Sequence, residues 1–474
     1  MNRKIRLILF SFLVFLYLLV APALIVYSLG YRVDFQNKKL VGTGGLYLKA
    51  WPQEVSILID NKTEKKTGIF SNQMLIQGLF PERHDFLIQK DGYYPWQKTL
   101  EIKSKEVTRV ENVTLIKKEL LFDKIQDAID YFSISPDNKS VLLTENLKGL
   151  TLFKLLDSQA KAEKASFEII NPKASAFNII WSNDSSRFLI EKQNAKFPFE
   201  YFIFKINETG KNNPEQISFI NGLKNPNLLV SDIAFSPSNP DELFFKQRNT
   251  LYLKNEKTSP VEEISPIIEK LTAYSFSGNR IIWLSESGYL FKSSFDGKQI
   301  DNLNENPFTL KENSDYKITA VNSFIFLSED KNIFLFNEKT KDFEKFYDSV
   351  NDLKVSPHND KILYFTDHEI LVSDLLKPQE KVSVLRFSED IESCFWINND
   401  YLVFNVGKEI KISETDIRDK VNIVEIPTTV FLNDNSLFEI KNPKIYFDQT
   451  NKKLYIFDQN AFLASEPLTD KNNK

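Results

Sequence analysis

The stretch YFSISPDNKSVLLT, from Tyr131 to Thr144, carries the pattern that decides the fold. Alternating apolar residues lead into Ser135-Pro136-Asp137-Asn138, and the apolar run Val141-Leu142-Leu143 follows. Proline presets the backbone angle that a turn needs, while Asp and Asn bond their own backbone or accept a left-handed conformation. The stretch therefore predicts a strand, a tight turn and a second strand. Because a lone hairpin is marginal in water, this unit must pack against others.

The same unit returns along the chain from 117 to 468. Its spacing of roughly 35 to 55 residues lies in the range of propeller blades. Short strands without a helical period are what a four-stranded blade needs. We expect a β-propeller of eight blades, with seven as the alternative. The expected lead strands begin near Tyr131, Asn178, Asp232, Ala273, Thr319, Asp352, Glu392 and Lys444.

Segments at the ends of this region suggest how a ring closes. Glu119 to Phe122 (ELLF) precedes the first blade and is predicted to form the outer strand of the last one, which would hide a sheet edge. Phe431 to Ile440 is additional material between the last two blades. Asp157 to Ala165 and Asn194 to Pro198 are polar insertions, expected to be loops.

The repeated phrases resemble the WD-repeat-like β-propellers of the TolB type, whose repeats carry F-S-P-D-G-K. Ser135-Pro136-Asp137-Asn138-Lys139, Ser236-Pro237 and Ser356-Pro357 match best, with Asn where the family has Gly. The resemblance covers about three quarters of the chain and implies the fold. It implies little about function, because propellers host binding modules and enzymes alike.

The N-terminus carries the second strong signal. Leu7 to Leu29 contains no charged residue, and about 20 apolar residues suffice to span a bilayer. Arg3, Lys4 and Arg6 precede it, so the positive-inside tendency leaves the N-terminus cytoplasmic and the bulk of the chain extracytoplasmic. We expect a single-pass anchor in the cell membrane. A cleaved signal peptide, ending near Ala21-Pro22-Ala23, and a buried core helix are the alternatives.

Between the anchor and the repeats, the alternation of apolar residues predicts a small β unit. It resembles the PEGA domain family, a small β-sandwich of exported and surface proteins of bacteria and archaea. The resemblance rests on GLYLKAWPQEVSILID (Gly45 to Asp60) and LIQGLFPERHDFLIQKDGYYPW (Leu75 to Trp96). Phe80-Pro81-Glu82-Arg83 stands near the place of the PEGA tetrapeptide itself. The matching positions are Pro52, Val55, Ile57, Asp60, Leu79, His84, Lys90, Gly92 and Tyr93.

These signals divide the chain into five parts. Residues 1–30 are the cytoplasmic tip and transmembrane anchor, and 31–43 are a linker. Residues 44–116 are the PEGA-like β-sandwich, 117–468 the propeller, and 469–474 a polar tail. The fold class is thus mainly β, and the 40 Phe and 17 Tyr suit a sheet-rich protein.

Composition argues against several kinds of chemistry. A net charge of −4 is not the basic footprint that nucleic acid requires. The single cysteine, Cys394, fits a small buried hydrophobe, and only three histidines occur, His84, His358 and His368. The sequence contains no P-loop, G-x-G-x-x-G, G-x-S-x-G or H-E-x-x-H motif. We therefore expect no catalytic residue, no metal site and no cofactor.

Four aromatic residues form the candidate binding site. Trp51, Tyr93, Tyr94 and Trp96 could stack on a sugar ring, and the alternative is that they pack the sandwich. The leading hypothesis is a membrane-anchored extracytoplasmic binding or scaffold protein of the cell envelope, whose partner is an envelope protein or a cell-wall glycan.

Two alternatives to this function stay open. The first is a propeller hydrolase acting on glycans or peptides, in which channel carboxylates do acid–base work. Asp232, Asp352 and Glu392 begin lead strands and are the nearest candidates. The second is a TolB-like envelope transport accessory, which requires partner proteins.

Overall fold

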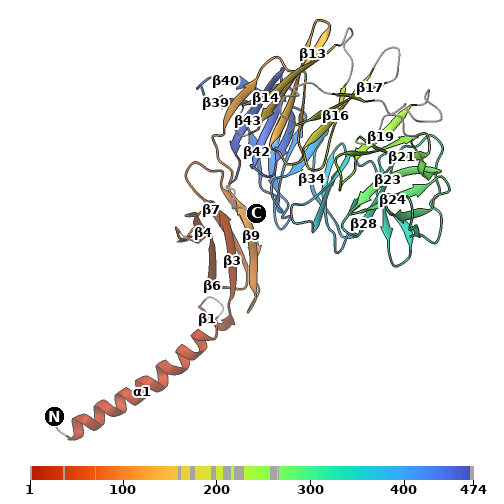
Figure 1. Cartoon of the computed structure of the whole chain (residues 1–474). Coiled ribbons are helices and arrows are strands. Elements are labelled where there is room, and N and C mark those ends of the chain that lie inside the picture. Colours follow the sequence, from red (N-terminus) through yellow and green to blue (C-terminus); the bar gives the residue numbers. More distant parts are fainter. Residues whose placement is uncertain are drawn as a thin grey trace.

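The computed structural model shows an N-terminal helix, a small unit of two β-sheets and a large ring of β-sheets (Figure 1). It describes residues 3–35, 38–69, 71–158, 162–170, 177–193, 199–206, 215–217, 229–256, 264 and 266–469. The predicted loop Asn194 to Pro198 and the tail from Asp470 lie outside this part of the chain.

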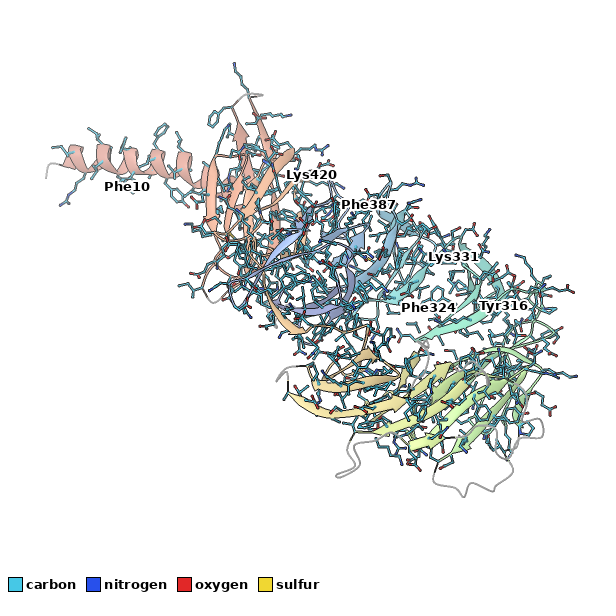
Figure 2. The ribbon with its side chains drawn as sticks, turned by 90° about the horizontal axis from the view of Figure 1, so that it is seen from above. Phe10, Tyr316, Phe324, Lys331, Phe387 and Lys420 are labelled. Carbon is cyan, nitrogen blue, oxygen red and sulfur yellow. The ribbon has the colours of Figure 1, made fainter. Side chains whose placement is uncertain are left out.

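Helix α1 (Arg3–Ser28) projects away from the rest of the molecule (Figure 1). Its segment Ile5–Ser28 is the one helix in the described residues that is long and apolar enough to cross a membrane, and none of the residues in this span is buried in the protein. Side chains such as Phe10, 67% exposed, extend into open space along its length (Figure 2). A helix that is apolar on all sides and that the protein leaves exposed along its span fits a membrane anchor or a signal sequence.

A β-hairpin follows the helix directly. Strands β1 (Tyr31–Asp34) and β2 (Lys39–Gly42) pair antiparallel, with Val33 opposite Leu40. The stretch predicted as a linker therefore has structure of its own.

The next unit, which we call the two-sheet unit, packs a three-stranded sheet against a four-stranded one. The first sheet has the order β6-β3-β9 and the second β5-β4-β7-β8. Apolar side chains from both sheets, among them Leu48, Ile57 and Phe86, form one buried core. The strands are β3 (Gly44–Trp51), β4 (Ser56–Ile59), β5 (Thr63–Lys66), β6 (Gln73–Leu79), β7 (Arg83–Gln89), β8 (Trp96–Glu101) and β9 (Val107–Thr114).

Seven antiparallel sheets follow in the described chain, each built from four strands consecutive in sequence. The first four sheets are β11 (Tyr131–Ile134), β12 (Ser140–Leu147), β13 (Leu150–Asp157) and β14 (Glu163–Ile170); β15 (Phe177–Trp181), β16 (Arg187–Gln193), β17 (Phe199–Lys205) and β18 (Glu215–Ile217); β19 (Val230–Phe235), β20 (Glu242–Gln247), β21 (Thr250–Asn255) and β22 (Pro266–Glu269); and β23 (Leu271–Ser277), β24 (Arg280–Ser285), β25 (Leu290–Ser293) and β26 (Asp301–Asn302). Because β14 begins at Glu163, the end of the predicted loop from Asp157 to Ala165 is strand.

Three more four-stranded sheets continue the series. They are β27 (Tyr316–Val321), β28 (Phe324–Glu329), β29 (Asn332–Asn337) and β30 (Asp342–Tyr347); β31 (Asp352–Val355), β32 (Lys361–Phe365), β33 (Glu369–Asp374) and β34 (Lys381–Arg386); and β35 (Ile391–Trp396), β36 (Tyr401–Val406), β37 (Glu409–Glu414) and β38 (Ile423–Ile426). First strands of neighbouring sheets contact each other, as β23 contacts β27 and β31 contacts β35.

The last sheet, here called the closing sheet, joins the two ends of the series. Its order is β40-β39-β10-β43-β42-β41. Strand β10 pairs antiparallel with β43 and parallel with β39. The predicted closure of the ring by the segment before the first blade is confirmed in part: the closing strand is Leu121–Gln126, which overlaps the predicted Glu119 to Phe122 at its last two residues. It is not the outer strand, because the extra material around Phe431 forms β39 and β40, which extend the sheet beyond it. The strands are β10 (Leu121–Gln126), β39 (Thr429–Leu432), β40 (Leu437–Glu439), β41 (Lys444–Asp448), β42 (Lys453–Asp458) and β43 (Ala461–Pro467).

Apolar clusters hold the ring together between its sheets. Within the described residues, each sheet shares a buried cluster with the next one along the chain. The first sheet and the closing sheet also share one, in which Val141 and Leu143 meet Tyr455 and Phe462. Successive four-stranded sheets packed face to face in a ring are the arrangement of a β-propeller.

The decisive turn folds as its residues dictate. The hydroxyl of Ser135 donates to Asp137 Oδ1 (2.7 Å) and accepts the amide N–H of Ser140 (2.9 Å). Asn138 takes the left-handed conformation with φ of 59°. A serine bonded in this way to the turn carboxylate and to the amide five residues on recurs in the turns that begin at Ser182 and Ser356. The repeated phrase is therefore a folding element.

Candidate functional site

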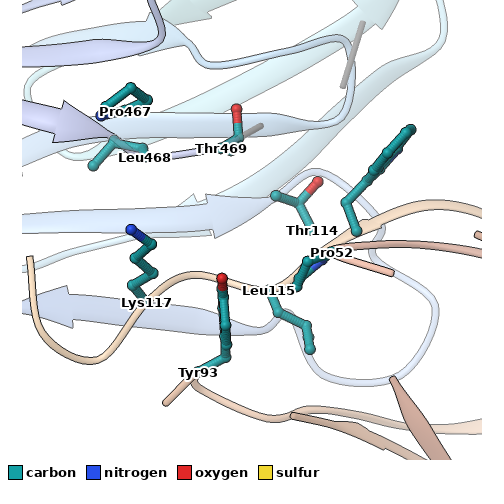
Figure 3. A pocket seen from close by; sticks show the side chains of 9 residues that line it. Pro52, Tyr93, Thr114, Leu115, Lys117, Pro467, Leu468 and Thr469 are labelled. Carbon is teal, nitrogen blue, oxygen red and sulfur yellow. The ribbon is translucent and has the colours of Figure 1, made fainter. Parts of the chain in front are cut away.

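A cleft lies where the two-sheet unit meets the closing sheet (Figure 3). Its volume is about 210 Å³. Tyr93 and Lys117, joined by an isolated β-bridge, extend from one wall toward Pro467 and Leu468 on the other. The lining is Trp51, Pro52, Tyr93, Thr114, Leu115, Lys117, Pro467, Leu468 and Thr469.

The structure brings two of the four predicted aromatic residues to this cleft. Trp51, at the end of β3, and Tyr93 are both partly exposed and line it. Tyr94 packs instead against the apolar cluster that the closing sheet shares with the β35–β38 sheet. Trp96 is 3% exposed, and its indole N–H donates to Glu414 Oε2 (2.7 Å). Stacking on a ligand stays a prediction, and Trp51 and Tyr93 are the residues whose positions suit it.

The cleft has a charged edge next to its aromatic residues. The Lys117 ammonium donates to Glu466 Oε2 at 2.5 Å, and both side chains are partly exposed. An apolar ring face beside a paired charge is suited to a ligand that has an apolar face and polar edges, such as a sugar or a peptide.

A buried lysine also connects the two-sheet unit to the propeller. Lys98 on β8 is wholly buried. Its ammonium donates to the carbonyl oxygens of Asp416 (2.5 Å) and Arg418 (2.7 Å), and it lies 3.0 Å from Glu414 Oε1. An ammonium has three protons, so these three acceptors satisfy it. The acceptors belong to the end of β37 and to the loop before β38.

The carboxylate that faces Lys98 is equally well satisfied. Glu414 is 3% exposed, and its Oε1 also accepts the backbone and side-chain N–H groups of Asn422 (2.9 and 2.7 Å). Its Oε2 accepts the Trp96 indole N–H. Because a buried charge is tolerated only when it is paired and hydrogen-bonded, this contact is built for one relative position of its two sides.

Asp416 completes the charge cluster at a partly exposed position. Burial raises the pKa of its carboxyl, but hydrogen bonds from Arg418 and the nearby Lys98 outweigh burial and lower the pKa below its ordinary value. The Arg418 guanidinium also donates to the backbone oxygen of Arg109 (2.9 Å). The loop between β37 and β38 thereby contacts two strands of the two-sheet unit.

The same loop covers a sheet edge. Strand β8 is the last strand of its sheet, so every second backbone N–H along it lacks a strand partner. The N–H of Gln97 donates to Asn422 Oδ1 (3.2 Å), and that of Thr99 donates to Asp419 Oδ2 (2.9 Å). The propeller loop therefore protects an edge that would otherwise be open to pairing with another chain.

A second group of contacts joins β9 to the turn before β36. Asn112 donates to Asp400 Oδ2 (2.7 Å), and the N–H of Thr114 donates to the Tyr401 hydroxyl (3.1 Å). Burial holds the pKa of Tyr401 well above its usual value. A cavity of about 240 Å³ lies between the two groups of contacts.

A further cavity of about 520 Å³ opens on the first strands of three sheets, β23, β27 and β31. Of the carboxylates considered for hydrolysis, Asp352 lines it and pairs with Lys354 (3.0 Å). Asp232 pairs with Lys246 (2.8 Å), and Glu392 accepts from Asn405 (3.1 Å), both away from this cavity. Each of the three carboxylates thus has a partner of its own, and only Asp352 lines this cavity.

The histidines and the cysteine lie in separate places. Cys394 is wholly buried in the cluster between the β31–β34 and β35–β38 sheets, as predicted for a small hydrophobe. His84 is buried, and its Nδ1 lies 2.7 Å from Asp60 Oδ2. His84 and Asp60 are both among the positions on which the resemblance to the PEGA family rests. In the described part of the chain, no group of three His, Cys, Asp or Glu residues could hold a metal ion.

Sequence reasoning missed Lys98 and Glu414. One signal was present, because Trp96, Lys98 and Leu100 share the buried face of β8. A lysine at an inward position between two apolar residues needs a buried partner. The identity of that partner could not be inferred, since it lies in the last third of the chain.

Comparison with known proteins adds the following. The sequence matches no protein-family model and no curated protein. Among solved structures, BamB from Moraxella catarrhalis aligns with 73% of this chain and all of its own, at 7% identity and a TM-score of 0.43. Hsv2 from Kluyveromyces marxianus covers 64% of this chain and 98% of its own, at 14% identity and a TM-score of 0.42. YCF48 from Cyanidioschyzon merolae covers 63% and 97%, at 11% identity and a TM-score of 0.39.

The class of protein follows from the order and packing of the sheets. The chain is a β-propeller protein with an N-terminal apolar helix, and a two-sheet unit lies between the helix and the propeller in the sequence.

Proposed function

We propose that this chain is a membrane-anchored, extracytoplasmic binding or scaffold protein of the cell envelope. In this proposal α1 is an uncleaved anchor with its N-terminus in the cytoplasm. The two-sheet unit, residues 44–116, is a PEGA-like sandwich, and residues 117–468 form an eight-bladed propeller. The observation that carries the proposal is the combination of an uncovered apolar helix with a propeller fixed to the helix-bearing unit through Lys98 and Glu414.

The fixed junction favours a scaffold over a flexibly tethered domain. Interfaces between domains in one chain are usually polar, and relative motion is the normal expectation. Here the contact includes a wholly buried ammonium and a covered strand edge. Such a contact holds the propeller at a set angle to the two-sheet unit that follows the anchor, which suits a protein that presents a binding surface.

The cleft at the junction is the binding site we favour. Trp51 and Tyr93 line it next to the Lys117–Glu466 pair. Stacking on an aromatic face combined with hydrogen bonds from the cleft edge suits a cell-wall glycan or an extended segment of an envelope protein.

Two experiments test this function with the full chain. The first asks whether the protein stays with membranes after carbonate extraction and whether external protease digests the propeller in intact spheroplasts. Release by carbonate would overturn the anchor, and protection from protease would overturn the topology.

The second experiment tests the cleft. A photo-crosslinking amino acid replaces Trp51 in cells, and the same group at Leu376, an exposed residue of the β33–β34 connection, is the control. We expect an envelope protein or glycan to be captured at position 51 and not at 376. Equal capture at both positions, or none at 51, would count against this binding site.

A further inference from the structure

The hairpin after the helix is held against the helix end by specific contacts. The backbone N–H and the hydroxyl of Thr43 both donate to the Gly30 oxygen (2.8 and 2.6 Å). The Arg32 guanidinium donates to the backbone carbonyl oxygens of Tyr27 and Tyr31 (2.9 Å each). It also lies 3.5 Å from the centre of the Tyr27 ring. The hairpin therefore has a set position beside the last turn of α1 (Figure 1).

The hairpin exposes an apolar surface that the protein leaves uncovered. Val33 and Leu40 face each other across the two strands and are 51% and 53% exposed. Phe35, which follows β1, is 86% exposed. Three large apolar side chains on a segment of this size are unusual for a surface bathed in water.

Basic residues accompany this apolar surface. The described part of the hairpin carries Arg32, Lys38 and Lys39 against one acid, Asp34. Lys105, from the turn before β9, adds a further cation 5.0 Å from the Tyr31 ring. Apolar side chains combined with an excess of Lys and Arg are the pattern of segments that lie in the headgroup layer of an anionic membrane.

The length of the helix sets the height of the hairpin. The 24 residues of Ile5–Ser28 span about 36 Å at 1.5 Å per residue, against a hydrocarbon core of about 30 Å. With α1 across the membrane, Tyr31 and the strands after it begin within the headgroup layer. The exposed side chains of the hairpin are then next to lipid.

We propose that the β1–β2 hairpin is a lipid-binding element. Val33, Phe35 and Leu40 enter the boundary between headgroups and acyl chains, and Lys38 and Lys39 bind anionic phospholipid headgroups. This inference rests on the proposed function, because it requires α1 in the membrane. It goes beyond anchoring, since it fixes how the extracytoplasmic part is held relative to the bilayer plane.

The test uses the full chain in nanodiscs of phosphatidylcholine alone or with phosphatidylglycerol. In a Cys394→Ala background, Phe35→Cys or Leu376→Cys carries a fluorescent label; both native side chains are 86% exposed, which makes Leu376 a matched control. Quenching by a nitroxide on the lipid headgroup reports lipid contact, and iodide reports contact with water. We expect lipid quenching and shielding from iodide at 35, and the reverse at 376.

Charge reversal separates the two contributions. Each lysine near an anionic surface strengthens binding to it about fivefold. In anionic discs, Lys38→Glu with Lys39→Glu should therefore lower the equilibrium constant for binding of the hairpin to lipid, measured by quenching at 35, at least about 25-fold. The effect in neutral discs should be far smaller.

The outcomes distinguish the two proposals. If the full chain does not insert into discs or float with vesicles, the proposed anchor fails. If it inserts and the label at 35 is quenched by iodide as strongly as at 376, the anchor stands and the hairpin proposal is overturned. The label at 35 could also be shielded from iodide by a second protein copy. In that case shielding would not change when protein-free phosphatidylglycerol vesicles are added, and it would be lost when the protein is diluted. That result would also overturn the hairpin proposal.

Discussion

Replacing Lys98 by methionine tests whether the buried charges fix the junction. Methionine fills a similar volume but leaves Glu414 as a buried carboxylate without a cation, and it leaves the oxygens of Asp416 and Arg418 without their donor. Removing one partner of a buried ion pair costs about 3–5 kcal/mol. Trp96 and Asn422 still donate to Glu414, so we expect the lower half of this range.

Hydrogen exchange at β8 measures this loss where it occurs. The amide groups of Gln97 and Thr99 donate to side chains of the propeller, so they exchange when the junction opens. A loss of about 3 kcal/mol of junction stability should speed their exchange roughly a hundredfold. Amides in the core of the propeller, such as that of Phe404, should keep their protection.

The matched control is Lys66→Met on β5, at the opposite edge of the same sheet. Lys66 and Glu64 form an exposed pair at 3.5 Å, with side chains 69% and 53% exposed, so its removal should change exchange less than about fivefold. Adding Glu414→Gln to Lys98→Met should restore much of the protection, because neither charge then remains. The reasoning is refuted if Lys98→Met speeds exchange at Gln97 and Thr99 by less than about tenfold.

Three further predictions concern the propeller. Burial, partly offset by Arg187, raises the pKa of Glu256 from 4.5 to about 6; the folded state then binds this proton more tightly than the unfolded state, so the contribution of Glu256 is full below pH 4.5 and is lost as the pH rises through 6. Urea unfolding at several pH values measures this loss, and Glu256→Gln should remove up to about 2 kcal/mol from the change in the free energy of unfolding between pH 4.5 and 6. If the free energy of unfolding changes with pH in the variant as it does in the native protein, the assignment is wrong. Asn359 has φ of 57°, so Asn359→Val should lower the free energy of unfolding by about 1–2 kcal/mol, whereas Asn359→Gly should change it by less than about 1 kcal/mol; equal losses would argue against backbone strain. Burial raises the pKa of the Cys394 thiol to about 12, so a water-soluble disulfide reagent at pH 8 should modify it no faster than the protein unfolds, and rapid modification of the native protein would show that the site is open.

The propeller could be predicted because its signals are local. Each repeat carries its own alternation and its own turn, and a serine such as Ser135 makes turn bonds within five residues of itself. The closing strand β10 could also be predicted, because an apolar run just before the first repeat marks its start. The hairpin was missed because β1 and β2 have only four residues each, too few for a period of two to stand out from chance.

The junction could not be predicted, because its partners are distant in sequence. Trp96 and Glu414 lie 318 positions apart, and nothing in either local pattern identifies the other. The aromatic residues 93, 94 and 96 were grouped because they are close in sequence. Their side chains separate in the fold, since an exposed cleft, an apolar cluster and a buried ion pair each take one of them.

Charges at the junction have a consequence that apolar residues there would lack. An apolar contact tolerates small shifts of one surface over another, whereas Lys98 is satisfied only where three acceptors converge on it. Replacing Lys98 and Glu414 by methionine and leucine should therefore leave unfolding midpoints nearly unchanged while loosening the angle between the two-sheet unit and the propeller. Distances between spin labels on β5 and β33 would broaden in that variant if the charges set the angle. If the hairpin also holds the two-sheet unit against the membrane, the same loosening would release the propeller from a fixed height above the bilayer, and capture of a partner at Trp51 would fall without any change in the cleft itself.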